Sequence, residues 1–290
     1  MMSTPRVGSA RKWRFIVAAI IVAGLAFQFW RSDPRALDAL RLPAPGLLAA
    51  ALVMGAASYL LLLDAWRYLR GLRESRRDVG GVWFASLFAR YAPGAVWQGA
   101  IRVGSAHFAG ESKRVVLERY VAEQALACFS ATTVSLALIV LAHVPTEPWL
   151  VGTLAFVATA ACAATVIGSR LGAALHWPLS AVLSVFGAHA SMGLGFVALV
   201  SSLTATISAP DAAAYVVMFF VAAIAGLLAL FVPAGLGVRE AVLASMLTPG
   251  FGAAPAIAIA IAARVWLLAC EGLAFALWWI ATRRARNRAA

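Results

Sequence analysis

The chain has 290 residues, of which 63% are hydrophobic and only 12% are charged, and its mean hydropathy is +0.87. This apolar content excludes the soluble globular classes and predicts an all-α, polytopic helical membrane protein. The net charge of +12 would suggest nucleic acid for a soluble chain, but here the arginines gather at the ends of apolar runs. That positive-inside pattern indicates contact with anionic lipid and no nucleic-acid partner.

Residues 1–290 are expected to form a single transmembrane domain with basic tails at 1–12 and 282–290. A straight helical span needs about 20 apolar residues. Uninterrupted runs of that kind predict seven full transmembrane helices, at residues 13–30, 46–63, 115–142, 149–168, 178–202, 212–231 and 254–281. Four basic residues at each end place both termini in the cytoplasm. Seven is odd, so of the two broken segments described below we expect one to cross the membrane and one to be re-entrant.

A basic face follows the second span. Arg67, Arg70 and Arg73 recur at every third residue, with Arg76 and Arg77 beyond them. Such spacing puts the side chains on one side of a helix that leaves the bilayer. We interpret this face either as a solvated cytoplasmic anchor or as a docking surface for lipid headgroups.

The first broken segment covers residues 82–108, where the apolar run is cut into pieces that are too short to span. Pro93 and Gly94 make the break, and polar or charged residues surround it. Its elements are Tyr91, Pro93, Gly94, Trp97, Gln98 and Arg102.

The second broken segment follows the run 212–231, where Pro233, Gly235 and Gly237 precede Arg239 and Glu240. Proline and glycine free backbone groups that hydrocarbon cannot bind, and a charge at mid-bilayer costs a few kcal/mol. Broken helices in both halves of a chain are a pointer to a binding site near the midplane. We therefore expect an inverted repeat that brings the two breaks together at mid-depth.

Helices that restart after a break direct free N–H groups inward and favour phosphate or carboxylate. Guanidinium groups add paired donors. The candidate ligands of a lipid headgroup are Arg102, Arg239 and Arg264, and the candidates for charge balance or proton coupling are Glu123, Glu240 and Glu271. Arg264 and Glu271 are seven residues apart and share a helix face. The alternative is that these charges are internal salt bridges that merely fasten the broken helices.

Glu240 is expected to fix either the Arg239 side chain or the broken backbone. The three cysteines have no paired spacing, so we expect neither a disulfide nor a metal site, and no cofactor. His189 lies within a span without a second histidine or an acid on its face, which favours a packed, internally bonded histidine.

Two motifs resemble the lysylphosphatidylglycerol synthase transmembrane, flippase-like family. They read Tyr91-Ala92-Pro93-Gly94-x-x-Trp97-Gln98-x-x-x-Arg102, and Pro233-Ala234-Gly235-Leu236-Gly237-Val238-Arg239-Glu240-Ala241 with Glu123 and Arg264 elsewhere. The corresponding motifs of the family are close to Y-x-P-G-x-x-W and P-G-G-L-G-V-R-E-A, and Ala234 stands where a glycine is common. The resemblance covers essentially the whole chain.

The resemblance implies translocation of a lipid between leaflets of a bacterial cytoplasmic (inner) membrane. The family includes the membrane half of the multiple peptide resistance factor, whose soluble aminoacyl-transferase half is not expected here. The expected substrate is an anionic phospholipid, or a lipid-linked glycan or isoprenoid lipid.

Two other functions stay open at this point. One is a membrane-embedded enzyme acting on lipid-linked phosphates or sugars. The sequence contains no acidic metal cluster and no Ser-His-Asp set, which argues against this function. The other is an accessory scaffold that partners the enzymes of lipid or glycan biosynthesis. The sequence does not specify the oligomeric state.

Overall fold

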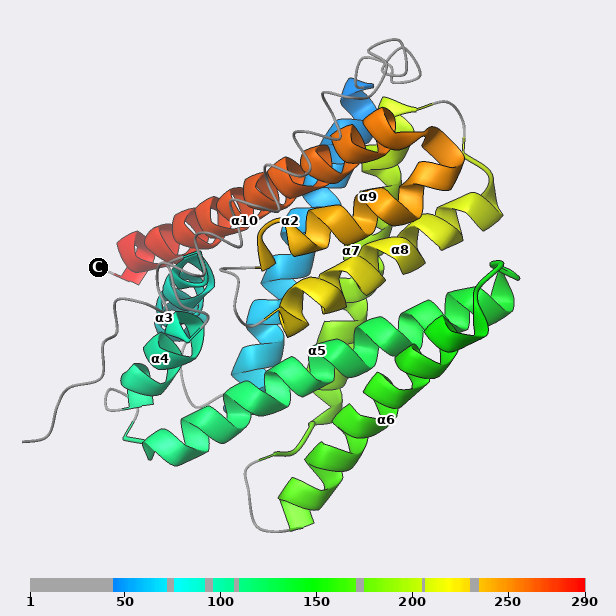
Figure 1. Ribbon diagram of the computed structural model, residues 1–290. Helices are drawn as coiled ribbons and strands as arrows, with labels where there is room; N and C mark the ends of the chain where they lie inside the picture. The colour runs from blue at the N-terminus through cyan, green and yellow to red at the C-terminus, as the bar shows by residue number, and fades with distance from the viewer. Residues whose placement is uncertain are drawn as a thin grey trace, which may run out of the picture.

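The computed structural model describes residues 44–71, 76–91, 96–106, 110–170, 175–204, 207–229 and 235–289, and the fold in these ranges is entirely helical (Figure 1). The first expected span, 13–30, lies outside the described residues, as do Pro93, Gly94 and Pro233. The helices are α2 (Pro45–Leu69), α3 (Arg76–Ala89), α4 (Trp97–Gly104), α5 (Lys113–Leu141), α6 (Pro148–Arg170), α7 (Leu179–Leu203), α8 (Ala209–Leu228), α9 (Val238–Phe251) and α10 (Ala253–Ala289).

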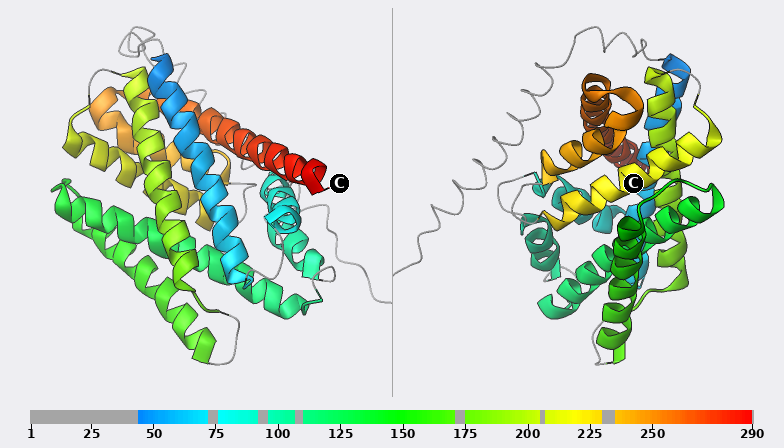
Figure 2. Two further views of the ribbon diagram at one scale, coloured as in Figure 1. Left: turned by 180° about the vertical axis from the view of Figure 1, so that it is seen from behind. Right: turned by 45° about the vertical axis from the view of Figure 1, so that its right-hand side comes forward.

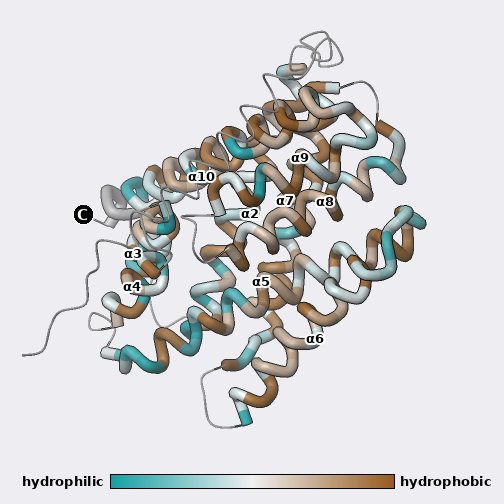
Figure 3. The backbone as a smooth tube through the Cα atoms, in the orientation of Figure 1, coloured by the Kyte–Doolittle hydropathy of each residue, from teal (hydrophilic) through white to brown (hydrophobic). Residues whose placement is uncertain are grey.

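Six helices in this part of the chain are long and apolar enough to cross a membrane. They are α2, α5, α6, α7, α8 and α10, and each corresponds to one of the expected spans. The prediction of a polytopic helical membrane protein is therefore confirmed. Figure 3 shows that hydrophobic residues predominate along these helices, while hydrophilic residues gather on the first turns of α5 and interrupt α10.

The three remaining helices are short. α3 and α9 have 14 residues each and α4 has eight. At 1.5 Å per residue, 14 residues extend over about 21 Å, which is less than the roughly 30 Å of the hydrocarbon core. α3 and α4 flank the first break and α9 follows the second, as expected for interrupted segments. α9 runs through Pro249 and ends at Phe251, with Gly252 as its C-cap.

α2 and α7 pack closely against each other in antiparallel directions (Figure 2). The backbone N–H of Ala44, before α2, donates to the carbonyl of Ser202, near the end of α7, at 3.1 Å. Small side chains allow the approach: a Cβ on Gly195 would lie 3.2 Å from the carbonyl oxygen of Ala51. Because lipid tails are as apolar as leucine, such close packing is a main source of association between helices in a bilayer.

Aromatic packing fixes the short helix α3 against α10. The ring centroids of Phe84 and Trp278 are 5.3 Å apart, and those of Phe84 and Phe275 are 5.4 Å apart. Gly80 lies so close to the Trp278 indole that a side chain there would require it to move. This contact helps to direct the end of α3 towards α10, where Arg90 pairs with Glu271.

The expectation of a solvated basic face after the second span is wrong for Arg70. Its side chain is only 4% exposed and pairs with Glu111 at 3.1 Å, and Glu111 also pairs with Arg119. Burial opposes ionisation of Glu111, but the two guanidinium groups outweigh it and lower the pKa of that carboxyl. The reason for the difference is that the turn before α5 supplies a carboxylate, which offsets the burial of Arg70. Arg67 pairs with Asp64 at 3.0 Å.

The expectation of an internally bonded His189 is confirmed. Cys128, Cys162 and Cys270 are all free. The Nδ1 atom of His189 lies 3.0 Å from the carbonyl oxygen of Val185, one turn earlier in α7.

Candidate functional site

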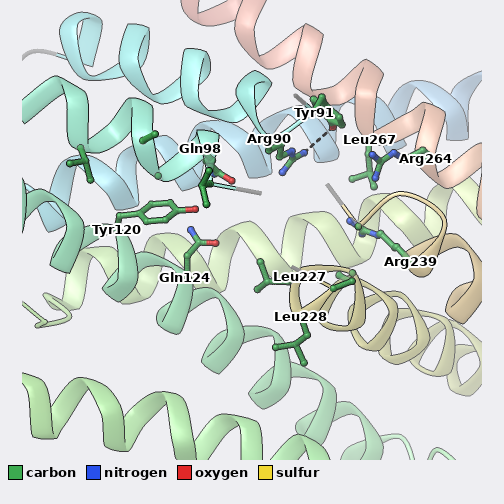
Figure 4. Close-up of a pocket in the computed structure, with 18 of the residues that line it drawn as sticks. Arg90, Tyr91, Gln98, Tyr120, Gln124, Leu227, Leu228, Arg239, Arg264 and Leu267 are labelled. Atoms are coloured by element: carbon green, nitrogen blue, oxygen red, sulfur yellow. Dashed lines mark hydrogen bonds between the residues drawn. The ribbon is translucent and has the colours of Figure 1, made fainter. Parts of the chain in front are cut away.

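A half-open cavity of about 830 Å³ lies between the described flanks of the two broken segments (Figure 4). Its walls come from the end of α3, from α4, from the first turns of α5, from the end of α8, from the start of α9 and from α10. Tyr91 and Gln98 stand on either side of the first break, while Gly235 and Arg239 follow the second. All four residues line this one cavity.

The described flanks of the two breaks thus border the same cavity, although the breaks are more than 130 residues apart in sequence. The prolines themselves are not described. The inverted pseudo-twofold axis therefore stays a prediction.

Glu271 joins three segments at one edge of the cavity. Its side chain is 1% exposed. It accepts hydrogen bonds from Tyr59 of α2 at 2.7 Å and from Tyr91 at 3.0 Å, and it forms an ion pair with Arg90. The end of α3 is therefore tied to α2 and α10 immediately before the first break.

Glu240 has two partners at the start of α9. Its Oε2 atom accepts a hydrogen bond from the backbone N–H of Gly237 at 2.6 Å, and its Oε1 atom lies 3.6 Å from Arg264 of α10. Gly237 has φ = 84°, a left-handed conformation that glycine adopts without strain. Glu240 thus caps the restarted helix, so it binds the broken backbone, which was one of the two expected roles.

Arg264 and Glu271 lie on one face of α10, as their spacing predicts, and this face is turned towards the cavity. Arg264 lines it and also lies over the Tyr91 ring, 5.4 Å from the centroid. Glu271 does not line the cavity itself but pairs with Arg90, which does.

Arg239 differs from the other cavity arginines. Its guanidinium carbon lies 4.7 Å from the centroid of the Phe219 ring. Within the part of the chain that the structure describes, its side chain makes no hydrogen bond and no ion pair. Figure 4 shows Arg239 and Arg264 approaching the same end of the cavity, with Arg90 nearby.

The charges around this end do not balance. Three guanidinium groups line the cavity, namely those of Arg90, Arg239 and Arg264. Among the described residues, Glu271 compensates Arg90 and Glu240 compensates Arg264. One positive charge is left, at Arg239. An isolated charge of this kind is costly away from water unless an anion accompanies it.

Arg102 and Glu123 form a separate cluster and do not line the cavity. Arg102 is completely buried, and its Nη1 atom donates to Glu123 at 2.8 Å while Nε donates to Ser86 at 2.6 Å. Its guanidinium also lies 4.1 Å from the centroid of the Trp66 ring. This pair joins α4 to α5 and fits the fastening role that was the alternative for the charged residues.

The remaining expected site residues do not all line the cavity. Trp97 is 48% exposed and is not part of the wall, whereas Gln98 is. Gly235 lines the cavity together with Gly226 at the end of α8, and a Cβ atom on Gly235 would lie 2.5 Å from the carbonyl oxygen of Gly226.

Three polar residues of the cavity wall were not among the predicted site residues: Arg90, Tyr120 and Gln124. Arg90 carried a usable signal, since it stands three residues before Pro93 in an apolar neighbourhood. Tyr120 and Gln124 are four residues apart and therefore on one face of α5, but nothing in the sequence indicates which element this face meets.

Fold and cavity together define a polytopic helical membrane protein with a half-open cationic cavity between short helices. Among the described residues, no cluster of three or more His, Cys, Asp or Glu side chains is placed to hold a metal ion. Comparison with protein-family models, with curated proteins and with solved structures found no match. Membership of the lysylphosphatidylglycerol synthase transmembrane family therefore stays a prediction.

Proposed function

We propose that this protein moves a lipid with an anionic headgroup between the leaflets of a membrane, and that the headgroup binds at Arg239. The observation that carries the proposal is the positive charge of Arg239, which has no ion-pair partner among the described residues, at the wall of a half-open cavity. A phosphate would compensate that charge, and the planar guanidinium can donate two parallel hydrogen bonds to it.

The cavity wall also contains the apolar surface that a lipid requires. Val103 and Leu117 line it on one side, and Leu227 and Leu228 on the other. Leu117 and Leu228 are 48% and 63% exposed, so this wall continues to the outer surface of the helices. Acyl or isoprenoid chains could therefore remain in the bilayer while the headgroup occupies the cavity.

A cavity of about 830 Å³ falls within the range of roughly 300 to 1,000 Å³ that is usual for small-molecule sites. Its position between interrupted helices is also where transporters place substrates. The motif resemblance supports the same reading. We propose a bacterial cytoplasmic membrane as the location, with membrane lipid as the substrate and enzymes of lipid or glycan assembly as candidate partners.

Arg239→Lys is expected to reduce lipid translocation by roughly tenfold, because lysine keeps the charge but loses the paired donors. The measurement follows headgroup-labelled anionic lipids between the leaflets of proteoliposomes, with and without a pH gradient. Arg114→Lys is the matched control. Arg114 is 79% exposed and pairs with Glu118 on the outside of α5, so this variant should transport normally.

A well-folded Arg239→Lys protein with unchanged transport would show that Arg239 is not the headgroup ligand. Failure of the wild-type protein to move any anionic phospholipid or polyprenyl phosphate would contradict the proposed function and favour an accessory role.

A further inference from the structure

The cavity has a second polar end that the cationic site does not explain. Gln98 of α4 and Tyr120 and Gln124 of α5 line it away from Arg239 (Figure 4). In Figure 4 the two amides and the phenol hydroxyl point into the same part of the cavity. None of these three side chains forms a hydrogen bond with any other residue that the structure describes.

Unused hydrogen-bonding groups at such a position need a partner. Each amide offers two N–H donors and a carbonyl acceptor, and the phenol offers one donor and an acceptor. The three side chains are half-buried and face the cavity, and hydrocarbon can supply none of the hydrogen bonds that they offer. A ligand or water must therefore bind here whenever the cavity is in use.

The chemistry of this end is neutral. The nearest guanidinium to the Tyr120 ring is that of Arg102, 5.8 Å from the centroid, and it is held by Glu123. Amide and phenol groups act as donor and acceptor at once, which matches hydroxyl groups, themselves donors and acceptors. They would leave a second phosphate or a carboxylate without a counter-charge.

The Tyr120 ring is also held in place. It packs on Gly99 of α4, where a Cβ atom would lie 3.2 Å from the ring. Gly99 is adjacent to Gln98, so one turn of α4 presents an amide and supports the tyrosine. The three polar groups are thus parts of one arrangement built from α4 and α5.

We infer that Gln98, Gln124 and Tyr120 form an uncharged subsite for the hydroxyl-bearing part of a headgroup, a polyol or a sugar, whose phosphate lies at Arg239. This inference rests on the proposed function and narrows its substrate class to lipid phosphodiesters with hydroxylated headgroups.

The test compares two short-chain lipids of equal charge on the full-length protein in detergent. Dioctanoyl phosphatidylinositol carries a polyol, whereas dioctanoyl phosphatidylmethanol has the same phosphodiester without hydroxyl groups. A second pair, glucosyl prenyl phosphate and methyl prenyl phosphate, distinguishes an isoprenoid source from a glycerolipid source. We expect the protein to bind the hydroxylated member of at least one pair about five- to tenfold more tightly, measured as a Kd by thermophoresis.

Gln124→Ala should remove this preference, because it deletes a hydrogen bond to the hydroxylated group. The affinity for the two methyl esters should stay unchanged within about twofold. Arg239→Gln should weaken the binding of both lipids of a pair by the same factor. Thr133→Ala is the control on the same helix, because Thr133 bonds only to the carbonyl of Phe129 and lies outside the cavity wall.

Each outcome separates the two ideas. If Gln124→Ala and Gln98→Ala both leave the preference intact, or if the wild-type protein has none while Arg239→Gln still weakens binding, the subsite is overturned and the Arg239 site stands. If the wild-type protein binds none of the four lipids, the proposed function itself is contradicted.

Discussion

Replacing Arg102 by leucine is expected to lower the free energy of unfolding by about 3 to 5 kcal/mol, because Glu123 would keep a buried charge without a cation beside it. Arg102 is 0% exposed, and Glu123 is 7% exposed at the side chain. The same substitution removes the hydrogen bond to Ser86 and the contact with the Trp66 ring. Denaturant-induced unfolding in mixed micelles, followed by tryptophan fluorescence, measures the loss.

The double variant Arg102→Leu with Glu123→Leu isolates the charge. Removing both partners leaves no unpaired ion, so the double variant should lose clearly less than the sum of the two single variants. Arg114→Leu is the control, since its pair with Glu118 is exposed to solvent and should contribute little. Additive losses in the cycle would show that the two charges do not depend on each other, against the structure.

The long helices could be predicted because length and apolar composition determine them almost alone. Every expected span within the described residues corresponds to a helix, with ends that differ by a few residues. The second span is extended from 63 to Leu69, where Asp64 and Arg67 pair with each other on the helix surface. Local pairing of this kind lets a helix carry charge beyond its apolar run.

The site could be predicted only in part. Its location follows from helix-breaking residues, and the shared face of Arg264 and Glu271 follows from helical periodicity. Periodicity cannot give the partners across helices. Arg102 pairs with Glu123, which is 21 residues away on another helix, and Arg70 pairs with Glu111, which is 41 residues away. Which charges neutralise each other, and so which one faces the cavity alone, depends on tertiary packing.

Adjacent residues illustrate the same limit. Arg239 and Glu240 are neighbours in sequence, but successive side chains of a helix point about 100° apart. Glu240 therefore turns back to the N–H of Gly237 while Arg239 faces the cavity. Of the neutral end of the cavity only Gln98 was predicted, as part of the first break, because Tyr120 and Gln124 carry no signal of their own until α4 and α5 are placed together.

Gly235→Ala is expected to be the most damaging substitution at the second break. Gly235 has φ = 63°, and a Cβ atom there would lie 2.5 Å from the carbonyl oxygen of Gly226. Left-handed strain and overpacking together should cost about 2 to 5 kcal/mol of unfolding free energy. The end of α8 and the start of α9 would separate. Arg239 would move as well, since it packs so closely on Gly226 that a Cβ atom added to Gly226 would lie 3.1 Å from the Cβ of Arg239.

The effect of Gly235→Ala should therefore appear twice, as a lower unfolding midpoint in micelles and as a loss of lipid translocation in the fraction that still folds. Gly272→Ala is the matched control. Gly272 is exposed within α10 with no heavy atom within 4 Å of an added Cβ, so alanine should stabilise that helix by up to about 1 kcal/mol. A Gly235→Ala protein as stable and as active as Gly272→Ala would show that close contact between α8 and α9 does not hold Arg239 at the cavity.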